Sequence, residues 1–180
     1  MVDPVLSLAC ALTLSYVFLA AGVHKVRDLT HFDATLGAYG LLPGVLVHPV
    51  SLLLPVMEFG IALGLLLPRS RLMAAWAGTA VLGVYTLAIG INLARGRRAV
   101  DCGCGDPGQK QSLSEWLLLR NGVLIGFAML IAAPALVRPA GWLDWTVAAL
   151  AASMFALLYS ACNQLLANSD QLINLRPSHG

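Results

Sequence analysis

The stretch LMAAWAGTAVLGVYTLAIGINL, Leu72–Leu93, carries no charged residue and is long enough to cross a membrane as a helix. A hydrocarbon core about 30 Å thick needs about 20 apolar residues in helical form. Other stretches of similar length and hydropathy lie before and after it. The sequence therefore predicts an all-α fold, a polytopic membrane helical bundle with five spans, at about residues 4–23, 49–67, 72–93, 113–133 and 143–166.

The composition supports a membrane protein and excludes several other classes. Hydrophobic residues make up 58% of the chain and charged residues 11%, whereas about 25% of the residues of a soluble domain are charged. The basic residues form no stripe, so a nucleic-acid partner is not expected. The first apolar run ends in AAGVHKVRD, which resembles no signal-peptide cleavage site, and we expect it to be a retained span. Because the connections are short, residues 1–180 are expected to form a single domain in the lipid bilayer.

The main polar interruption is RGRRAVDCGCGDPGQKQ, Arg95–Gln111. Its glycines permit the sharp bend that a disulfide between Cys102 and Cys104 requires, and a strained, exposed disulfide exchanges readily with other thiols. Arg97 and Arg98 nearby favour the thiolate form. This pattern predicts a thiol–disulfide exchange site.

The cysteines leave a second interpretation open. A C-x-C pair also carries soft metals such as Cu(I), and His24 and His31 are expected on the same side of the membrane. Two cysteines alone cannot complete a tetrahedral zinc site, so no resident metal is predicted. Cys10 is expected to be a small buried residue, whereas the position of Cys162 near the end of its span makes it a possible resolving thiol.

Polar side chains within the spans form a second group of candidates. Glu58 and Arg120 are expected at similar depth on parallel helices, and we predict an ion pair between them. Asn121 follows Arg120, and both are treated as supporting residues. A structural role and a role in binding quinone or moving protons both remain open. Lys25 is expected near the bundle mouth beside the C-x-C pair, and Asn92 is expected to be an interfacial cap.

The side of the membrane that carries the C-x-C pair is not settled by charge. Seven Lys and Arg residues fall on that side and three on the other, which by the positive-inside rule favours a cytoplasmic location. Setting aside Arg97 and Arg98, which serve the thiols in this hypothesis, leaves five against three. Exchange with a periplasmic partner requires the opposite orientation, and we expect the periplasmic one.

Three stretches of the sequence together resemble the MauE family, the methylamine utilisation membrane proteins of the DoxX-like group. They are AAGVHKVRDLTHFDATLGAYGLLPG, PVMEFGIALGLLL and INLARGRRAVDCGCGDPGQKQSLSEWLLLRNGVLI. The resemblance implies a four-helix DoxX-like core plus a fifth transmembrane helix, in the bacterial inner membrane. Where many members carry C-x-C-F-G, this chain has Gly105 and Asp106 after its second cysteine.

The resemblance also implies a function. Such proteins are expected to support maturation of the small subunit of methylamine dehydrogenase, together with a thioredoxin-like MauD-type protein. Cys102 and Cys104 would then be the exchange pair, supported by Arg120 and Asn121. The architecture is also similar to that of quinone-coupled thiol oxidoreductases. The alternatives are a non-enzymatic export or assembly factor for the same subunit, and a copper carrier.

Overall fold

The computed structural model describes residues 2–97, 115–134, 136 and 141–175, and for residues 166–175 it describes the helix but not the side chains. Five of its helices are long and apolar enough to cross a membrane, which confirms the predicted all-α bundle. The DoxX-like relationship of the core stays a prediction. The helices are α1 (Pro4–Arg27), α2 (Leu29–Ala38), α3 (Gly44–Leu66), α4 (Arg71–Ala94), α5 (Glu115–Ala132) and α6 (Trp142–Leu175).

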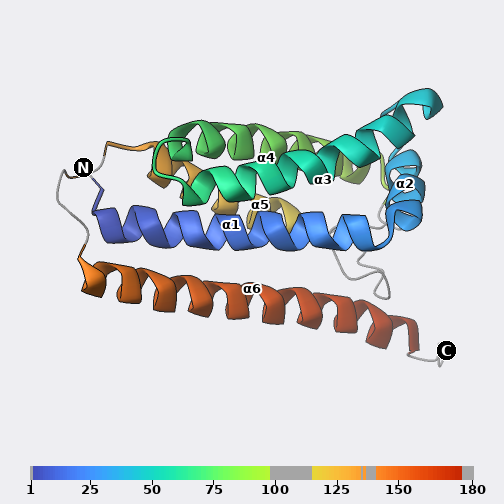
Figure 1. The fold of residues 1–180 in the computed structure, drawn as a ribbon. Helices are drawn as coiled ribbons and strands as arrows, with labels where there is room; N and C mark the ends of the chain where they lie inside the picture. The colour runs from blue at the N-terminus through green and yellow to red at the C-terminus, as the bar shows by residue number, and fades with distance from the viewer. Residues whose placement is uncertain (1, 98–114, 135, 137–140, 176–180) are drawn as a thin grey trace.

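Four of the spans form a ring around a common core (Figure 1). Helix α1 packs against α3 and α5, and α4 packs against the same two helices, so α1 lies diagonally opposite α4. Helix α6 lies outside the ring against α1. Successive spans alternate in direction. One end of the bundle therefore holds the last residues of α1 and α4, the first residues of α3 and α5, and α2, and we call it the α2 end.

Local sequence signals explain how α1 begins and ends. Asp3 accepts a hydrogen bond from the Val5 N–H at 2.8 Å, and Pro4 occupies the first helical position, where its missing N–H has no cost. The helix continues to Arg27, four residues past the predicted end of the span. Asp28 then accepts from the His31 N–H at 2.9 Å and so begins α2.

Helix α2 was not predicted, and α3 begins earlier than predicted. With ten residues, α2 is too short to span a membrane and lies across the end of the bundle. Helix α3 begins at Gly44 and contains both Pro49 and Pro55. Each proline removes one backbone hydrogen bond from the helix interior, and the first turns of α3 extend beyond its neighbours, where Val45 is 84% exposed.

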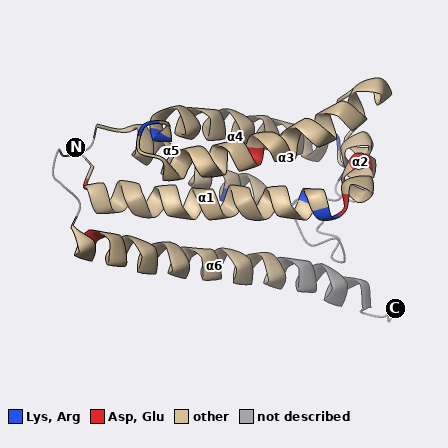
Figure 2. Ribbon diagram, in the orientation of Figure 1, with Lys and Arg blue, Asp and Glu red and all other residues tan. Residues whose placement is uncertain are grey.

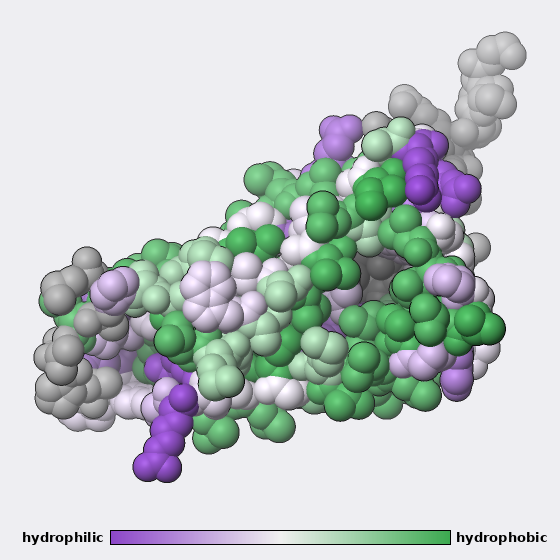
Figure 3. Space-filling view, turned by 90° about the horizontal axis from the view of Figure 1, so that it is seen from above, coloured by the Kyte–Doolittle hydropathy of each residue, from purple (hydrophilic) through white to green (hydrophobic). Residues whose placement is uncertain are grey.

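Burial ranks α1 as the central helix and α6 as a peripheral one. In the most apolar window of each, 56% of α1 is buried but only 11% of α6. Small residues let α1 approach its neighbours closely: a Cβ at Gly22 would lie 3.1 Å from the Phe59 ring, and one at Gly78 would lie 3.1 Å from the Phe18 ring. The face of the bundle seen in Figure 3 is largely apolar, as expected of a surface in contact with lipid. The core includes Leu14, Phe18, Ile61, Leu65, Leu82 and Leu124.

Candidate functional site

Three polar side chains from three helices meet inside the bundle towards the α2 end. Lys25 of α1 donates from Nζ to Oε1 of Glu58 in α3 at 2.6 Å, and the Tyr85 hydroxyl of α4 donates to the same oxygen at 2.8 Å. We call these three residues the polar triad. Glu58 is fully buried and Lys25 is 3% exposed, so the protein shields the ion pair almost completely from solvent. Such a pair is tolerated because each charge neutralises the other.

Two aromatic rings surround the ammonium group of the triad. Lys25 Nζ lies 5.4 Å from the centroid of the Phe32 ring and 5.3 Å from that of Tyr85. Both distances allow a cation–π interaction, which is strongest where the cation is removed from water. Phe32 belongs to α2 and is buried. The short helix that the sequence did not predict therefore helps to enclose the triad.

The structure gives Glu58 a different partner from the one predicted. Figure 2 shows charged residues mostly near the helix ends. Glu58 of α3 and Arg120 of α5 lie within spans. Arg120 donates from Nη1 to Asn163 Oδ1 of α6 at 3.4 Å, and its guanidinium lies 5.6 Å from the Tyr159 ring centroid. The physical reason is the ring order, because α3 and α5 both pack on α1 and α4. Lys25 is placed at the expected end of the bundle but is buried inside it.

Two asparagines are buried near the same end. Asn92 is fully buried and donates from Nδ2 to the Ala88 carbonyl at 3.0 Å, so it is not the interfacial cap that the sequence suggested. Asn121 is 2% exposed. The Asn92 Oδ1 and Asn121 Nδ2 atoms have no hydrogen-bond partner within the described residues. A buried polar atom without a partner is costly, and both are candidates for contact with a ligand or with water.

The C-x-C pair and its flanking residues are only partly described. Cys102, Cys104 and Arg98 lie outside the described residues. The preceding residues are described: Gly96 ends α4 in the left-handed conformation, with φ 72°, and the Arg97 N–H then donates to the Asn92 carbonyl at 3.0 Å. The Arg97 guanidinium lies against Gly40, where a Cβ would be 3.1 Å from Nη1. The segment thus leaves the bundle beside the connection between α2 and α3.

The two other cysteines are free thiols within spans. Cys10 of α1 is buried in the core, as expected, and Cys162 of α6 is half-buried beside Asn163. The role of Cys162 as a resolving thiol stays a prediction. In the part of the chain that the structure describes, no three His, Cys, Asp or Glu side chains are grouped as metal ligands.

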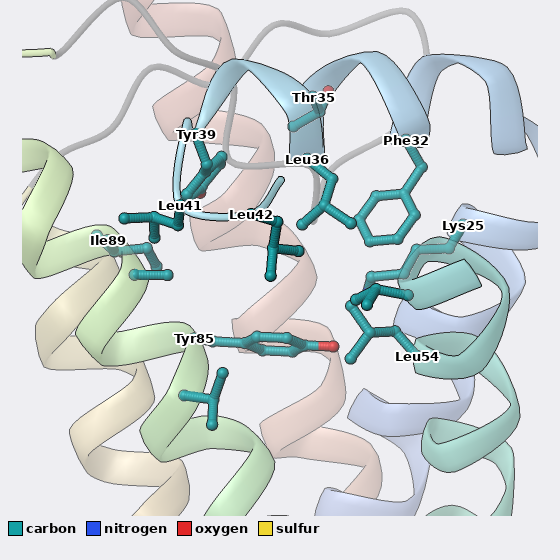
Figure 4. A pocket seen from close by; sticks show the side chains of 13 residues that line it. Lys25, Phe32, Thr35, Leu36, Tyr39, Leu41, Leu42, Leu54, Tyr85 and Ile89 are labelled. Carbon is teal, nitrogen blue, oxygen red and sulfur yellow. The ribbon is translucent and has the colours of Figure 1, made fainter. Parts of the chain in front are cut away.

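A cavity of about 230 Å³ lies next to the polar triad (Figure 4). Helix α2 forms its roof with Phe32, Leu36 and Tyr39, and the Tyr85 ring lies along its floor. The Lys25 side chain forms part of one wall, and the surfaces of the cavity are otherwise apolar. The sequence did not identify Tyr85 or Phe32 as site residues. Its one signal was a phenol within an otherwise apolar span, and tyrosine is also frequent in spans near the membrane–water interface, where it serves as an anchor.

Comparison with known proteins relates the chain to one family. The family described as "Methylamine utilisation protein MauE" matches residues 3–134. Three relatives named methylamine utilization protein MauE cover most of the chain. The protein of Paracoccus versutus is 37% identical over 91% of this chain and 88% of its own length, and that of Paracoccus denitrificans 35% over 92% and 89%. The protein of Methylophilus methylotrophus is 33% identical over 91% and 87%.

The chain belongs to the MauE family. The MauE match includes α1 to α5, and so it contains the polar triad, the lining of the cavity and the C-x-C pair. Helix α6, with Cys162 and Asn163, follows the matched residues. No solved structure matches the chain. The resemblance found in the sequence is confirmed at the level of the family.

Proposed function

We propose that this chain is a thiol–disulfide exchange protein of the bacterial inner membrane that serves methylamine utilisation. In this proposal Cys102 and Cys104 exchange with a thioredoxin-like MauD-type partner, which acts on the small subunit of methylamine dehydrogenase. Membership of the MauE family supports the pathway. The C-x-C pair between two arginines and a helix supports the chemistry.

The observation that carries the proposal is where the C-x-C segment is attached. It follows α4 directly and precedes α5, and both attachment points lie at the α2 end, near the polar triad and the cavity. A thiol pair held at the mouth of a membrane bundle can be reached by a soluble partner. It can also pass electrons to a group inside the membrane.

The exchange itself is balanced without any further reactant. A disulfide between Cys102 and Cys104 is attacked by a thiolate of the partner, which gives a mixed disulfide, and the second partner thiol then releases the chain. The partner gains a disulfide, and the two cysteines of this chain become thiols. Arg97, which leaves α4 with its side chain exposed, is suited to stabilise a thiolate.

The test is labelling of intact spheroplasts with a membrane-impermeant maleimide, read by mass spectrometry at Cys102 and Cys104. A background with Cys10→Ala and Cys162→Ala removes the thiols of the spans. We expect labelling only after reduction by an impermeant phosphine, because the pair rests as a periplasmic disulfide. Labelling restricted to lysed membranes would contradict exchange with a periplasmic partner.

A trapping experiment separates exchange from the alternatives. With a partner whose second, releasing cysteine is replaced by serine, the mixed disulfide with this chain should accumulate, and purified wild-type protein should oxidise a reduced thioredoxin-like protein. A client held in a mixed disulfide without such turnover would replace the proposal by an assembly role. Stoichiometric Cu(I) binding that requires both cysteines, without exchange, would replace it by metal transport.

A further inference from the structure

We propose that the cavity between α2, α3 and α4 binds the ring of a lipid-soluble quinone, with the Lys25 ammonium as the hydrogen-bond donor to one of its oxygens and the Tyr85 ring as a stacking surface. The role of the quinone as electron acceptor of the thiol pair rests on the function proposed above. The binding of the quinone in the cavity is inferred from the described residues alone.

The size and position of the cavity fit a single ring. A cavity of about 150 Å³ is enough to hold benzene. The volume here, about 230 Å³, leaves room for ring substituents. Figure 3 shows a hollow bordered by hydrophobic side chains on the face formed by α3 and α4, towards the end where α2 lies. A molecule dissolved in the bilayer can therefore enter without crossing water.

The lining favours a flat ring over the acyl chain of a lipid. Three of the lining residues are aromatic, and the Tyr85 ring lies flat along the floor, where a second ring can stack against it (Figure 4). Leu54 and Ile89 close two sides. An acyl chain needs only apolar surface and gains nothing from the buried ammonium group at one wall.

The charge of the triad favours a neutral head over an anionic one. The Lys25 ammonium is already neutralised by Glu58, so the wall presents donors without net charge. An ammonium has three N–H donors, of which one is directed to Glu58 Oε1 at 2.6 Å. A quinone oxygen that becomes negative during reduction would draw on these donors, whereas a fatty-acid carboxylate would be repelled by Glu58.

The end of α4, after which the C-x-C segment follows in the sequence, lies close to the cavity. Ile89 lines the cavity, and α4 ends at Ala94, about 7.5 Å further along the helix axis at 1.5 Å per residue. In the overall reaction two S–H bonds break and one S–S bond forms between Cys102 and Cys104. The two electrons reduce the quinone, and the two protons end on its oxygens as a quinol.

Binding is tested on the full-length protein in nanodiscs prepared from phospholipid without quinone. The probe is radiolabelled decylubiquinone, and uptake into empty nanodiscs is subtracted. Ala88→Phe places a ring into the cavity and should weaken binding about tenfold or more, a loss of about 1.4 kcal/mol. Ala80→Phe makes the same change at an exposed position of α4 and should leave binding unchanged. Equal affinity of the two variants would overturn the proposal.

A second measurement uses the wild-type protein, so it does not depend on whether a substituted protein folds. A photoreactive benzoquinone is bound to the wild-type protein, irradiated, and mapped by mass spectrometry. Adducts are expected on the lining residues of α2, α3 and α4, and unlabelled decylubiquinone should suppress them. Adducts confined to α6 or to lipid would overturn the proposal. Tyr85→Leu, which removes the stacking ring, should weaken binding more than Tyr85→Phe, which keeps it, and equal affinity of the two variants would remove Tyr85 as a stacking surface for the quinone.

The same binding assay with Cys102→Ser/Cys104→Ser separates this inference from the proposed function. Binding should be unchanged, because the cavity contains neither cysteine. Binding without any thiol exchange would reject the exchange function and keep the quinone site. Exchange without quinone binding would reject only the quinone site. If the protein both exchanges thiols and binds quinone, reduced wild-type protein supplied with quinone should form one quinol for each disulfide. The double serine variant should form no quinol.

Discussion

At the level of residues, Lys25 and Glu58 form a buried ion pair between α1 and α3. Both side chains are buried, and Nζ lies 2.6 Å from Oε1. Removing one partner of a buried pair leaves an uncompensated charge, which costs about 3–5 kcal/mol. We therefore expect Glu58→Gln to lower the free energy of unfolding by about that amount, measured by denaturation in detergent micelles.

A double variant provides the control for that prediction. Lys25→Met together with Glu58→Leu removes both charges, and its loss should be smaller than the sum of the single losses. Tyr85→Phe removes one hydrogen bond and should cost about 1 kcal/mol. Additive losses of Lys25→Met and Glu58→Leu would show that the two side chains do not stabilise one another.

A second residue-level prediction concerns pH. The Ser51 hydroxyl and the His48 ring lower the pKa of Asp33, and His48 Nδ1 lies 2.8 Å from Asp33 Oδ2. Because the folded-state pKa of Asp33 is depressed, the stability it contributes is present above about pH 3.9, the ordinary value of an Asp. It is lost as the pH falls through the lower folded-state value.

The measurement is hydrogen–deuterium exchange of α2, corrected for the intrinsic effect of pH. Asp33 in α2 and His48 in α3 join these two helices, so α2 should lose protection selectively in acid. The effect should be small, since the His48 side chain is 70% exposed. Asp33→Asn should remove the acid-dependent step. A step that persists in this variant would assign the titration to another group.

At the level of elements, α3 and α4 approach each other closely at Gly64, near the end of α3. A Cβ at Gly64 would lie 2.9 Å from the Ala74 Cβ, and the Ser70 hydroxyl donates to the Gly64 carbonyl at 3.0 Å. Gly64→Ala should therefore push the two helices apart and cost about 1–3 kcal/mol.

Gly60 is the matched control on the same helix. A Cβ there meets nothing within 4 Å, so Gly60→Ala should be neutral or slightly stabilising through its helix propensity. The comparison is made by thermal unfolding in the same detergent. Equal melting temperatures of the two variants would show that the close approach at Gly64 contributes nothing.

The glycines also show how far sequence reasoning reaches for an element. Length and hydropathy predicted five spans, because membrane thickness alone imposes that requirement, but α3 begins five residues earlier than predicted and α6 continues nine residues beyond residue 166. A GxxxG spacing alone does not identify a helix contact: of the glycines in the pairs Gly60/Gly64 and Gly122/Gly126, only Gly64 lies at a close approach. Which face of a helix meets which neighbour depends on the order of helices in the ring.

The same limit explains the missed partner of Glu58. Depth along parallel helices was inferred from the sequence, and it favoured Arg120. The ring places α1 and α4 between those two helices, so Glu58 meets Lys25 and Tyr85 instead. Helix α2 was missed because ten residues with mixed polarity give no span signal. Only its cap, Asp28 with the His31 N–H, was a sequence-level cue.

At the level of the whole molecule, the structure weakens the charge argument for a cytoplasmic thiol side. Lys25 was counted among the basic loop residues, yet it is 3% exposed and neutralised by Glu58. Without Lys25, Arg97 and Arg98, the balance is four basic residues against three. Such a small difference does not fix the orientation of a protein with five spans.

Orientation is testable with two single cysteines in a background that lacks the four native ones. Ala34→Cys lies on an exposed position of α2, and Arg69→Cys lies at the exposed turn between α3 and α4, at the opposite end of the bundle. With the α2 end in the periplasm, an impermeant maleimide should label Ala34→Cys in spheroplasts and Arg69→Cys only after lysis. Protection of Ala34→Cys and labelling of Arg69→Cys would place the C-x-C attachment points in the cytoplasm. A soluble periplasmic partner could then not reach the pair, whereas the proposed quinone site would keep its place among α2, α3 and α4 in either orientation.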